Sequence, residues 1–261
     1  MSLPITLVWL RRDLRLFDHT ALQTAIRLGR PLAAVFVFDR DIIDDLPADD
    51  RRLSFIHESI SEMQAALHAK NVPLWVLHGR AAEALPALAA QLNAAAVVCA
   101  EDYEPQAIAR DNQVWRALDA DGRALVRVTD QVMLAKAEVM TQQGRPYSVF
   151  TPYKRVWLQK LDAFQCTPYP VQRYAQHLAA LPSPSTPLPT LEALGFTPTN
   201  LPTLALPTGM SGAQQLLQDF LPRLHAYHEA RDFPGRKGVS YLSAHLRFGT
   251  ISIRQLAALA A

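Results

Sequence analysis

The stretch ITLVWL, residues 5–10, is an apolar run that leads directly into the charged stretch RRDLRLFD, residues 11–18. An uninterrupted apolar run of this length is typical of a strand buried on both faces of a parallel sheet. Four similar runs follow, at residues 33–38, 74–79, 95–100 and 124–128. Helical patterns separate them, near residues 20–28, 52–70, 81–92 and 105–120. This alternation predicts an α/β domain over residues 1–130, built on a doubly wound parallel sheet of five strands.

Beyond residue 130 the pattern changes twice. A helix is expected at about 150–163, with Thr151 as its cap and Pro152 at its first position. Residues 166–208 hold nine of the chain's 19 prolines and no periodic apolar pattern, so we interpret residues 131–208 as a connector with a long Pro-rich linker wrapped over the surface.

A helical pattern returns over residues 209–261. Two or three helices cannot enclose a large core alone. We therefore expect this segment to dock on the α/β domain or to be the front portion of something longer.

Composition narrows the class of protein. The chain has 261 residues, of which 49% are hydrophobic and 19% charged, which excludes a disordered or fibrous chain. The net charge is only +2, but residues 221–261 carry six Lys/Arg against two acids, a local excess of +4 that favours an anionic partner. No stretch resembles a signal peptide or a membrane span, and the two cysteines lie far apart. These features predict a cytoplasmic protein that is not bound to a membrane.

The charged stretch at residues 11–18 stands where a dinucleotide-binding sheet would carry G-x-G-x-x-G. Neither that motif nor a P-loop is present, which argues against an NAD-type or P-loop site. The carboxyl ends of parallel strands still form a ligand crevice, which Glu101 and Asp102 could also line. We favour the alternative that the charged side chains of residues 11–18 pair with one another and fix the corner. Asp18 or Thr20 could cap the helix that follows.

A second informative stretch is YHEARDFPGRKGVSYLSAHLRFG, residues 227–249. Two glycines bracket a basic loop, and Ser240 and Ser243 stand at the expected start of a short helix. Free backbone N–H groups and serine hydroxyls at such a start could hold a diphosphate, although Ser240 could equally be a simple N-cap. Nearby, His225, His228 and Glu229 have the spacing of metal ligands but lack a fourth, so we expect a solvated helix face and no metal.

Taken together, three stretches resemble the photolyase/cryptochrome family, most closely its bacterial members that act on cyclobutane pyrimidine dimers. They are LVWLRRDLRLFDHTAL near the start, VFTPYKRVW, and YHEARDFPGRKGVSYLSAHLRFGTIS near the end. The resemblance covers the whole chain, and the chain corresponds to about the first half of such a protein.

The resemblance implies an α/β domain that can hold an antenna chromophore, followed by the first helices of an all-helical domain that binds FAD. It implies deoxyribodipyrimidine photo-lyase activity, in which the excited, reduced flavin passes an electron to a dimer flipped out of damaged DNA. The 261-residue chain alone is expected to be inactive and monomeric. A cryptochrome-type blue-light receptor and a stand-alone α/β nucleotide-binding module are the alternatives.

The resemblance also assigns residues. Those matching the family's FAD contacts are Tyr227, Val239, Ser240, Tyr241, Leu242 and Ser243. Arg231 matches a DNA-contacting arginine, and the catalytic residues are expected beyond residue 261. The antenna crevice would be lined by Arg11, Phe38, Arg51 and Glu101. Ala107 stands where folate-binding members have a carboxylate, which argues against folate and leaves a deazaflavin or flavin antenna open.

Overall fold

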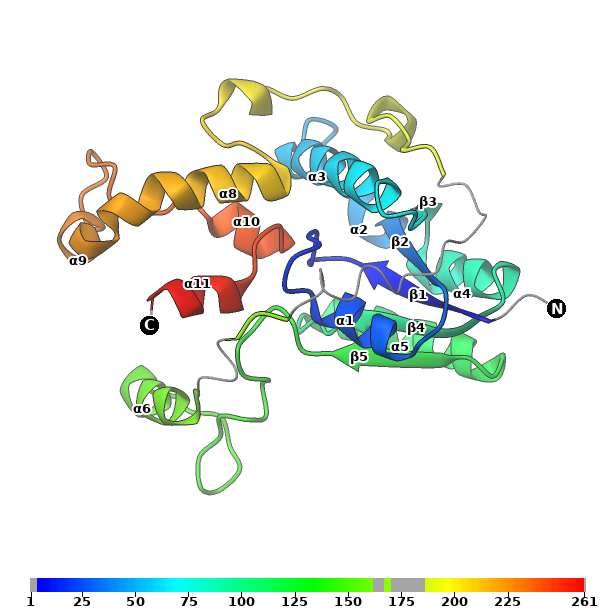
Figure 1. Cartoon of the computed structure of the whole chain (residues 1–261), viewed down its shortest axis with the longest axis horizontal. Helices are drawn as coiled ribbons and strands as arrows, with labels where there is room; N and C mark the ends of the chain where they lie inside the picture. Colours follow the sequence, from blue (N-terminus) through cyan, green and yellow to red (C-terminus); the bar gives the residue numbers. More distant parts are fainter. Residues whose placement is uncertain (1–3, 162–166, 170–185, 261) are drawn as a thin grey trace.

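A computed structural model of the chain describes residues 4–161, 167–169 and 186–260. It contains one sheet of five parallel strands in the order β3-β2-β1-β4-β5 (Figure 1). The strands are β1 (Ile5–Leu10), β2 (Leu32–Asp39), β3 (Leu74–Gly79), β4 (Ala94–Ala100) and β5 (Ala124–Val128). This confirms the predicted doubly wound α/β domain. The strand order changes direction between β1 and β4, which places the ligand crevice of such sheets at the carboxyl ends of these two strands.

Successive residues of β1 supply the two faces of the sheet, as the period of a strand requires. Val8 and Leu10 pack beneath α1 (Thr20–Arg27) and α3 (Arg51–His68). Leu7 and Trp9 pack beneath α4 (Ala81–Gln91) and α5 (Pro105–Ala120) on the other face. All six residues of β1 are buried, which is why its sequence shows no polar alternation. A single turn, α2 (Arg40–Ile43), follows β2.

The second part of the chain is helical. Its elements are α6 (Phe150–Lys160), η2 (Glu192–Leu194), η3 (Leu201–Thr203), α8 (Gly209–Phe220), η4 (Leu221–Ala226), α9 (Tyr227–Ala230), α10 (Ser243–Phe248) and α11 (Ile253–Ala260). In Figure 1, α8 lies along α3, and α10 and α11 lie close to the carboxyl end of β1. Leu217 of α8, Leu242 and Ile251 belong to a small core of their own. The helical segment thus docks on the α/β domain through α8 and α3, which was one of the two expectations.

The connector follows the surface of the α/β domain where it is described. Thr197 donates its backbone N–H to Ala48 O at 2.8 Å, and Leu194 and Phe196 pack into the core beneath α1 and α3. This confirms the expected wrapping for residues 186–208. Cys166 and residues 170–185 of the Pro-rich linker lie outside the described residues.

Two helices begin where they were predicted, at Phe150 and Thr20, but their predicted caps were wrong. The helix expected at 150–163 spans Phe150–Lys160, so Thr151 lies inside it, and its N-cap is Val149. The first crossover helix is capped by His19, whose Nδ1 accepts the Leu22 N–H at 3.2 Å, rather than by Asp18 or Thr20. Asp18 adopts a left-handed conformation (φ 46°), and its carboxylate is bound elsewhere. Among the described helices, none is long and apolar enough to cross a membrane.

Candidate functional site

The charged stretch after β1 forms a buried ion network that joins the sheet to the C-terminal helices. Asp18 accepts hydrogen bonds from Arg254 Nε at 3.0 and 3.1 Å and from the hydroxyl of Ser252. Arg15 meets Asp130 at 2.7 Å, and Arg254 also reaches Asp130 at 3.1 Å. The charged side chains are at most 7% exposed. We call Arg15, Asp18, Asp130 and Arg254 the clamp.

Electrostatics favour the ionised forms of two clamp groups, Asp130 and Arg254. Burial alone would raise the pKa of Asp130, but the charges of Arg15, His19 and Arg254 hold it well below the ordinary carboxyl range. Burial would likewise lower the pKa of Arg254, yet Asp130 and Asp18 raise it above its ordinary value. Two cations and two anions therefore balance inside the protein, which is the condition under which buried charges are tolerated.

The prediction that the side chains of residues 11–18 pair mainly with one another was wrong. Their partners lie far away in sequence because the ends of β1, β4 and β5 and the start of α11 converge at one edge of the sheet. The two sequence-distant clamp residues were missed. Asp130 could have been found, since it follows β5 at the same edge. Arg254 sits in an apolar helical pattern that carries no such signal.

The remaining arginines of the corner act in the same way. Arg11 pairs with Asp111 at 2.5 Å, and its guanidinium stacks 4.6 Å from the ring centre of Trp9. Arg12 reaches Asp102 at 3.2 Å and donates to the backbone oxygen of Arg247 in α10. Asp102 thus lies beside the corner, as expected from its strand end.

The four predicted antenna residues do not share one surface. Phe38 is 2% exposed and packs with Phe36 in the core beneath α1 and α3. Arg11 lies with Trp9 on the opposite face of the sheet, and Arg51 binds Asn200 Oδ1 of the connector at 2.7 Å. Glu101 follows β4, where its N–H donates to the backbone oxygen of Val128 in β5. Arg11 and Phe38 are engaged within the protein, so the antenna crevice stays a prediction.

The predicted flavin residues lie along the end of the helical segment. Tyr227 opens α9, is 38% exposed and meets the edge of Phe220 at 6.0 Å between ring centres. The guanidinium of Arg231 lies 5.8 Å from the centre of the Tyr227 ring. The loop after α9 folds back on this helix at Gly238, where a Cβ would stand 2.6 Å from the backbone oxygen of Ala230. This close approach brings Val239 and the residues after it back toward α9.

The turn before α10 has an unusual backbone. Tyr241 is left-handed (φ 57°), although it is not glycine, and Leu242 follows with φ −86° and ψ 4°. Left- and right-handed residues in succession point neighbouring N–H groups to one side and form an anion-binding concavity. The described residues offer no acceptor for the amides of Ser240 and Tyr241. Ser243 opens α10, whose N-terminus has no side-chain cap. We call residues 239–243 the α10 turn.

Two readings of the α10 turn change with the structure. Ser240 is not the N-cap, because that position belongs to Leu242, whose N–H reaches Ser240 Oγ at 3.4 Å. The Leu242 side chain is 2% exposed in the helical core, so only its backbone could contact a ligand. Among the described residues, no cluster of three His, Cys, Asp or Glu could hold a metal ion.

Comparison with known proteins identifies relatives of the whole chain. Residues 6–174 match the profile of the family described as DNA photolyase. The deoxyribodipyrimidine photo-lyase of Halobacterium salinarum is 36% identical over 260 residues, which cover 95% of this chain and 53% of that protein. An uncharacterised 31.6 kDa protein of Synechococcus sp. is 35% identical over 254 residues, covering 97% of this chain and 88% of that protein.

Among solved structures, a bacterial class III photolyase from Agrobacterium tumefaciens superposes with a TM-score of 0.83 at 27% identity. The match covers 99% of this chain and 52% of that one. The chain therefore spans about half the length of the photo-lyases that it matches.

Proposed function

Because the chain belongs to the DNA photolyase family, as its motifs predicted, we propose that it supplies the α/β domain and the first flavin-binding helices of a light-driven lyase that splits cyclobutane pyrimidine dimers. The observation that carries this proposal is the left-handed Tyr241 at the α10 turn. A non-glycine residue in this conformation costs about 1 kcal/mol or more, and such strain is commonly found where a ligand is held.

In this proposal the α10 turn holds the diphosphate of FAD. The amides of Ser240 and Tyr241 donate to the phosphate oxygens, and the hydroxyls of Ser240 and Ser243 add further donors. Val239 and Leu242 contribute backbone only, and Tyr227 contacts the cofactor from α9. FAD would supply the light-driven electron that opens the dimer ring. These residues bind and orient it.

Damaged DNA is the proposed substrate, and its phosphates would meet the basic loop beside the α10 turn. Arg231, Arg236 and Lys237 are exposed there, consistent with the local positive charge of residues 221–261. We propose a monomer that acts in the cytoplasm, with residues 1–130 as an antenna-type domain for a flavin or deazaflavin, residues 131–208 as the connector, and residues 209–261 as the start of the flavin domain.

Flavin binding tests the α10 turn directly. FAD is titrated into the 261-residue chain and followed by the loss of its fluorescence, with inorganic pyrophosphate as competitor. We expect weak, saturable binding that pyrophosphate competes away and that Ser240→Ala weakens. Ser211→Ala, at an exposed serine in α8, is the matched control. FAD binding that neither pyrophosphate nor Ser240→Ala changes would contradict the assignment.

Repair is tested in a chimera that joins residues 1–261 to the second half of the Halobacterium salinarum photo-lyase. We expect a flavin-loaded chimera to remove dimers from irradiated DNA in blue light and not in the dark. A chimera that keeps its flavin but repairs nothing would argue against the lyase and in favour of the cryptochrome-type alternative.

A further inference from the structure

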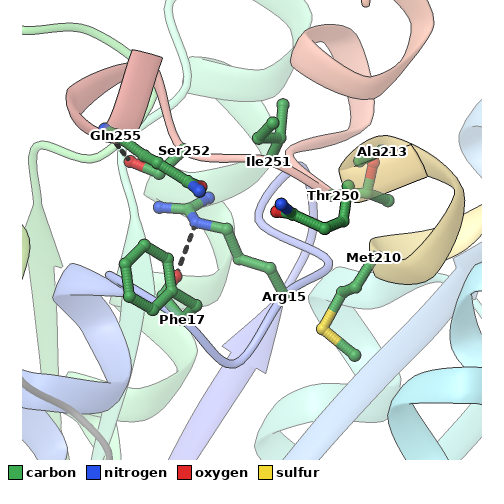
Figure 2. A pocket seen from close by; sticks show the side chains of 9 residues that line it. Arg15, Phe17, Met210, Ala213, Thr250, Ile251, Ser252 and Gln255 are labelled. Atoms are coloured by element: carbon green, nitrogen blue, oxygen red, sulfur yellow. Dashed lines mark hydrogen bonds between the residues drawn. The ribbon is translucent and has the colours of Figure 1, made fainter. Parts of the chain in front are cut away.

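A second candidate site lies away from the α10 turn, at the seam between the α/β domain and the helical segment. A cavity of about 290 Å³ opens where the loop after β1 meets α8 and the start of α11 (Figure 2). Its apolar lining includes Phe17, Met210 and Ile251, and its polar lining includes Arg15, Gln214 and Gln255. None of these residues belongs to the proposed flavin site.

The polar side of the cavity has unused hydrogen-bonding capacity. Arg15 donates through Nε to Phe17 O at 3.0 Å, through Nη1 to Gly249 O at 3.2 Å, and through Nη2 to Asp18 O and Asp130. A guanidinium has five N–H groups, so one on Nη1 has no acceptor among the described residues.

Two amides complete the polar side. The side-chain amides of Gln214, which is exposed, and Gln255, which is half-buried, line the cavity and form no hydrogen bond with the described part of the chain. Each amide offers both a donor and an acceptor. The cavity therefore presents a matched set of donors and acceptors to whatever enters it.

Charge and size restrict the ligand. Arg15, which lines the cavity, and Arg254 are paired with Asp18 and Asp130, so the clamp adds no net positive charge that would attract an anion. Ligand pockets for drug-sized molecules begin at about 300 Å³, so this cavity suits a single ring system and not a dinucleotide. The ring of Phe17 and the side chain of Met210 supply the apolar contacts that a flat ring needs (Figure 2).

We propose that this seam cavity binds one neutral nucleobase, as a free base or nucleoside. A glutamine amide pairs with the edge of a base through two hydrogen bonds, the arrangement by which proteins read adenine. The free N–H of Arg15 would donate to a ring nitrogen or carbonyl oxygen, and the base would stack on Phe17. The bound base would touch both parts of the chain and so stabilise their docking. This proposal does not depend on the flavin assignment.

The test uses the 261-residue chain and adenosine as the probe, with binding measured by titration calorimetry and thymidine as a second probe. We expect saturable binding that is insensitive to salt, with AMP no tighter than adenosine because the site is neutral. Gln255→Leu and Gln214→Leu should each weaken binding about tenfold, since each removes one paired edge worth about 1–3 kcal/mol. Gln159→Leu, at an exposed position of α6, is the matched control and should bind as wild type does.

Circular dichroism and unfolding midpoints establish that each variant is folded, and Gln214 is exposed, so its replacement leaves the core intact. Saturable binding of either nucleoside that is lost in the two cavity variants supports the proposal. Binding of neither nucleoside, binding that both variants retain, or much tighter and salt-sensitive binding of AMP would overturn it.

Discussion

Replacing Arg254 with methionine tests the clamp, because this residue joins α11 to the sheet. The substitution keeps an unbranched apolar stem but removes the guanidinium and its hydrogen bonds to Asp18 and Asp130. One buried cation, Arg15, would then remain with two buried anions, Asp18 and Asp130, so one negative charge would be uncompensated. Breaking a buried pair in this way costs about 3–5 kcal/mol of unfolding free energy. Domains are commonly stable by about 5–15 kcal/mol in total.

The assay is urea unfolding followed by far-UV circular dichroism, combined with limited proteolysis. Because the clamp holds the C-terminal helices, we expect Arg254→Met to make residues 209–260 sensitive to protease before the sheet unfolds. Arg40→Met, which breaks the exposed Arg40–Asp44 pair, is the matched control and should leave the midpoint unchanged.

A double variant separates charge from packing. Asp18→Asn together with Arg254→Met leaves Arg15 and Asp130 as a balanced pair. We expect the double variant to recover part of the lost stability, with a coupling energy of at least about 1 kcal/mol. Wild-type stability in Arg254→Met, or strict additivity in the double variant, would refute the argument that balanced buried charge holds the segment.

Three further outcomes follow from the geometry. Gly249→Ala should lower the free energy of unfolding in urea by at least about 2 kcal/mol. Residue 249 has a left-handed backbone (φ 67°), and a Cβ there would stand 2.0 Å from the backbone oxygen of Arg12. Gly144→Ala is the control and should cost less, because residue 144 is also left-handed (φ 70°) but its Cβ would meet no atom within 4 Å. Burial lowers the pKa of His245 from 6.5 to about 4, so the unfolded chain takes up a proton at this residue before the folded chain does. The free energy of unfolding should therefore fall by up to about 2 kcal/mol between pH 7 and pH 5. His245→Gln should flatten this dependence on pH, and an unchanged dependence would contradict the assignment. Burial raises the pKa of the Cys99 thiol to about 11. Peptide mapping should therefore find Cys99 unmodified by iodoacetamide at pH 8 until urea unfolds the chain. Labelling of Cys99 in the folded protein would contradict its burial in β4.

Local sequence determined the α/β domain almost completely. Apolar runs such as residues 5–10 and 95–100 can be stable only as strands covered on both faces, and parallel strands need helical crossovers between them. The short helix that Ser243 opens also followed from local pattern, although its N-cap is Leu242 and not Ser240. The family motifs added which of these stretches belong together.

Tertiary structure alone decided what the charged stretch after β1 does. Its composition allowed pairing within the corner, but the end of β5 brings Asp130 to 2.7 Å from Arg15, and α11 brings Arg254 to 3.0 Å from Asp18. The left-handed Tyr241 was equally hidden, since no propensity favours that conformation for tyrosine. The ion pairs of the clamp depend on contacts between residues far apart in the chain. Local sequence sets the conformation of short segments, whereas ion partners and backbone strain are set by the packing of elements that the sequence does not place side by side.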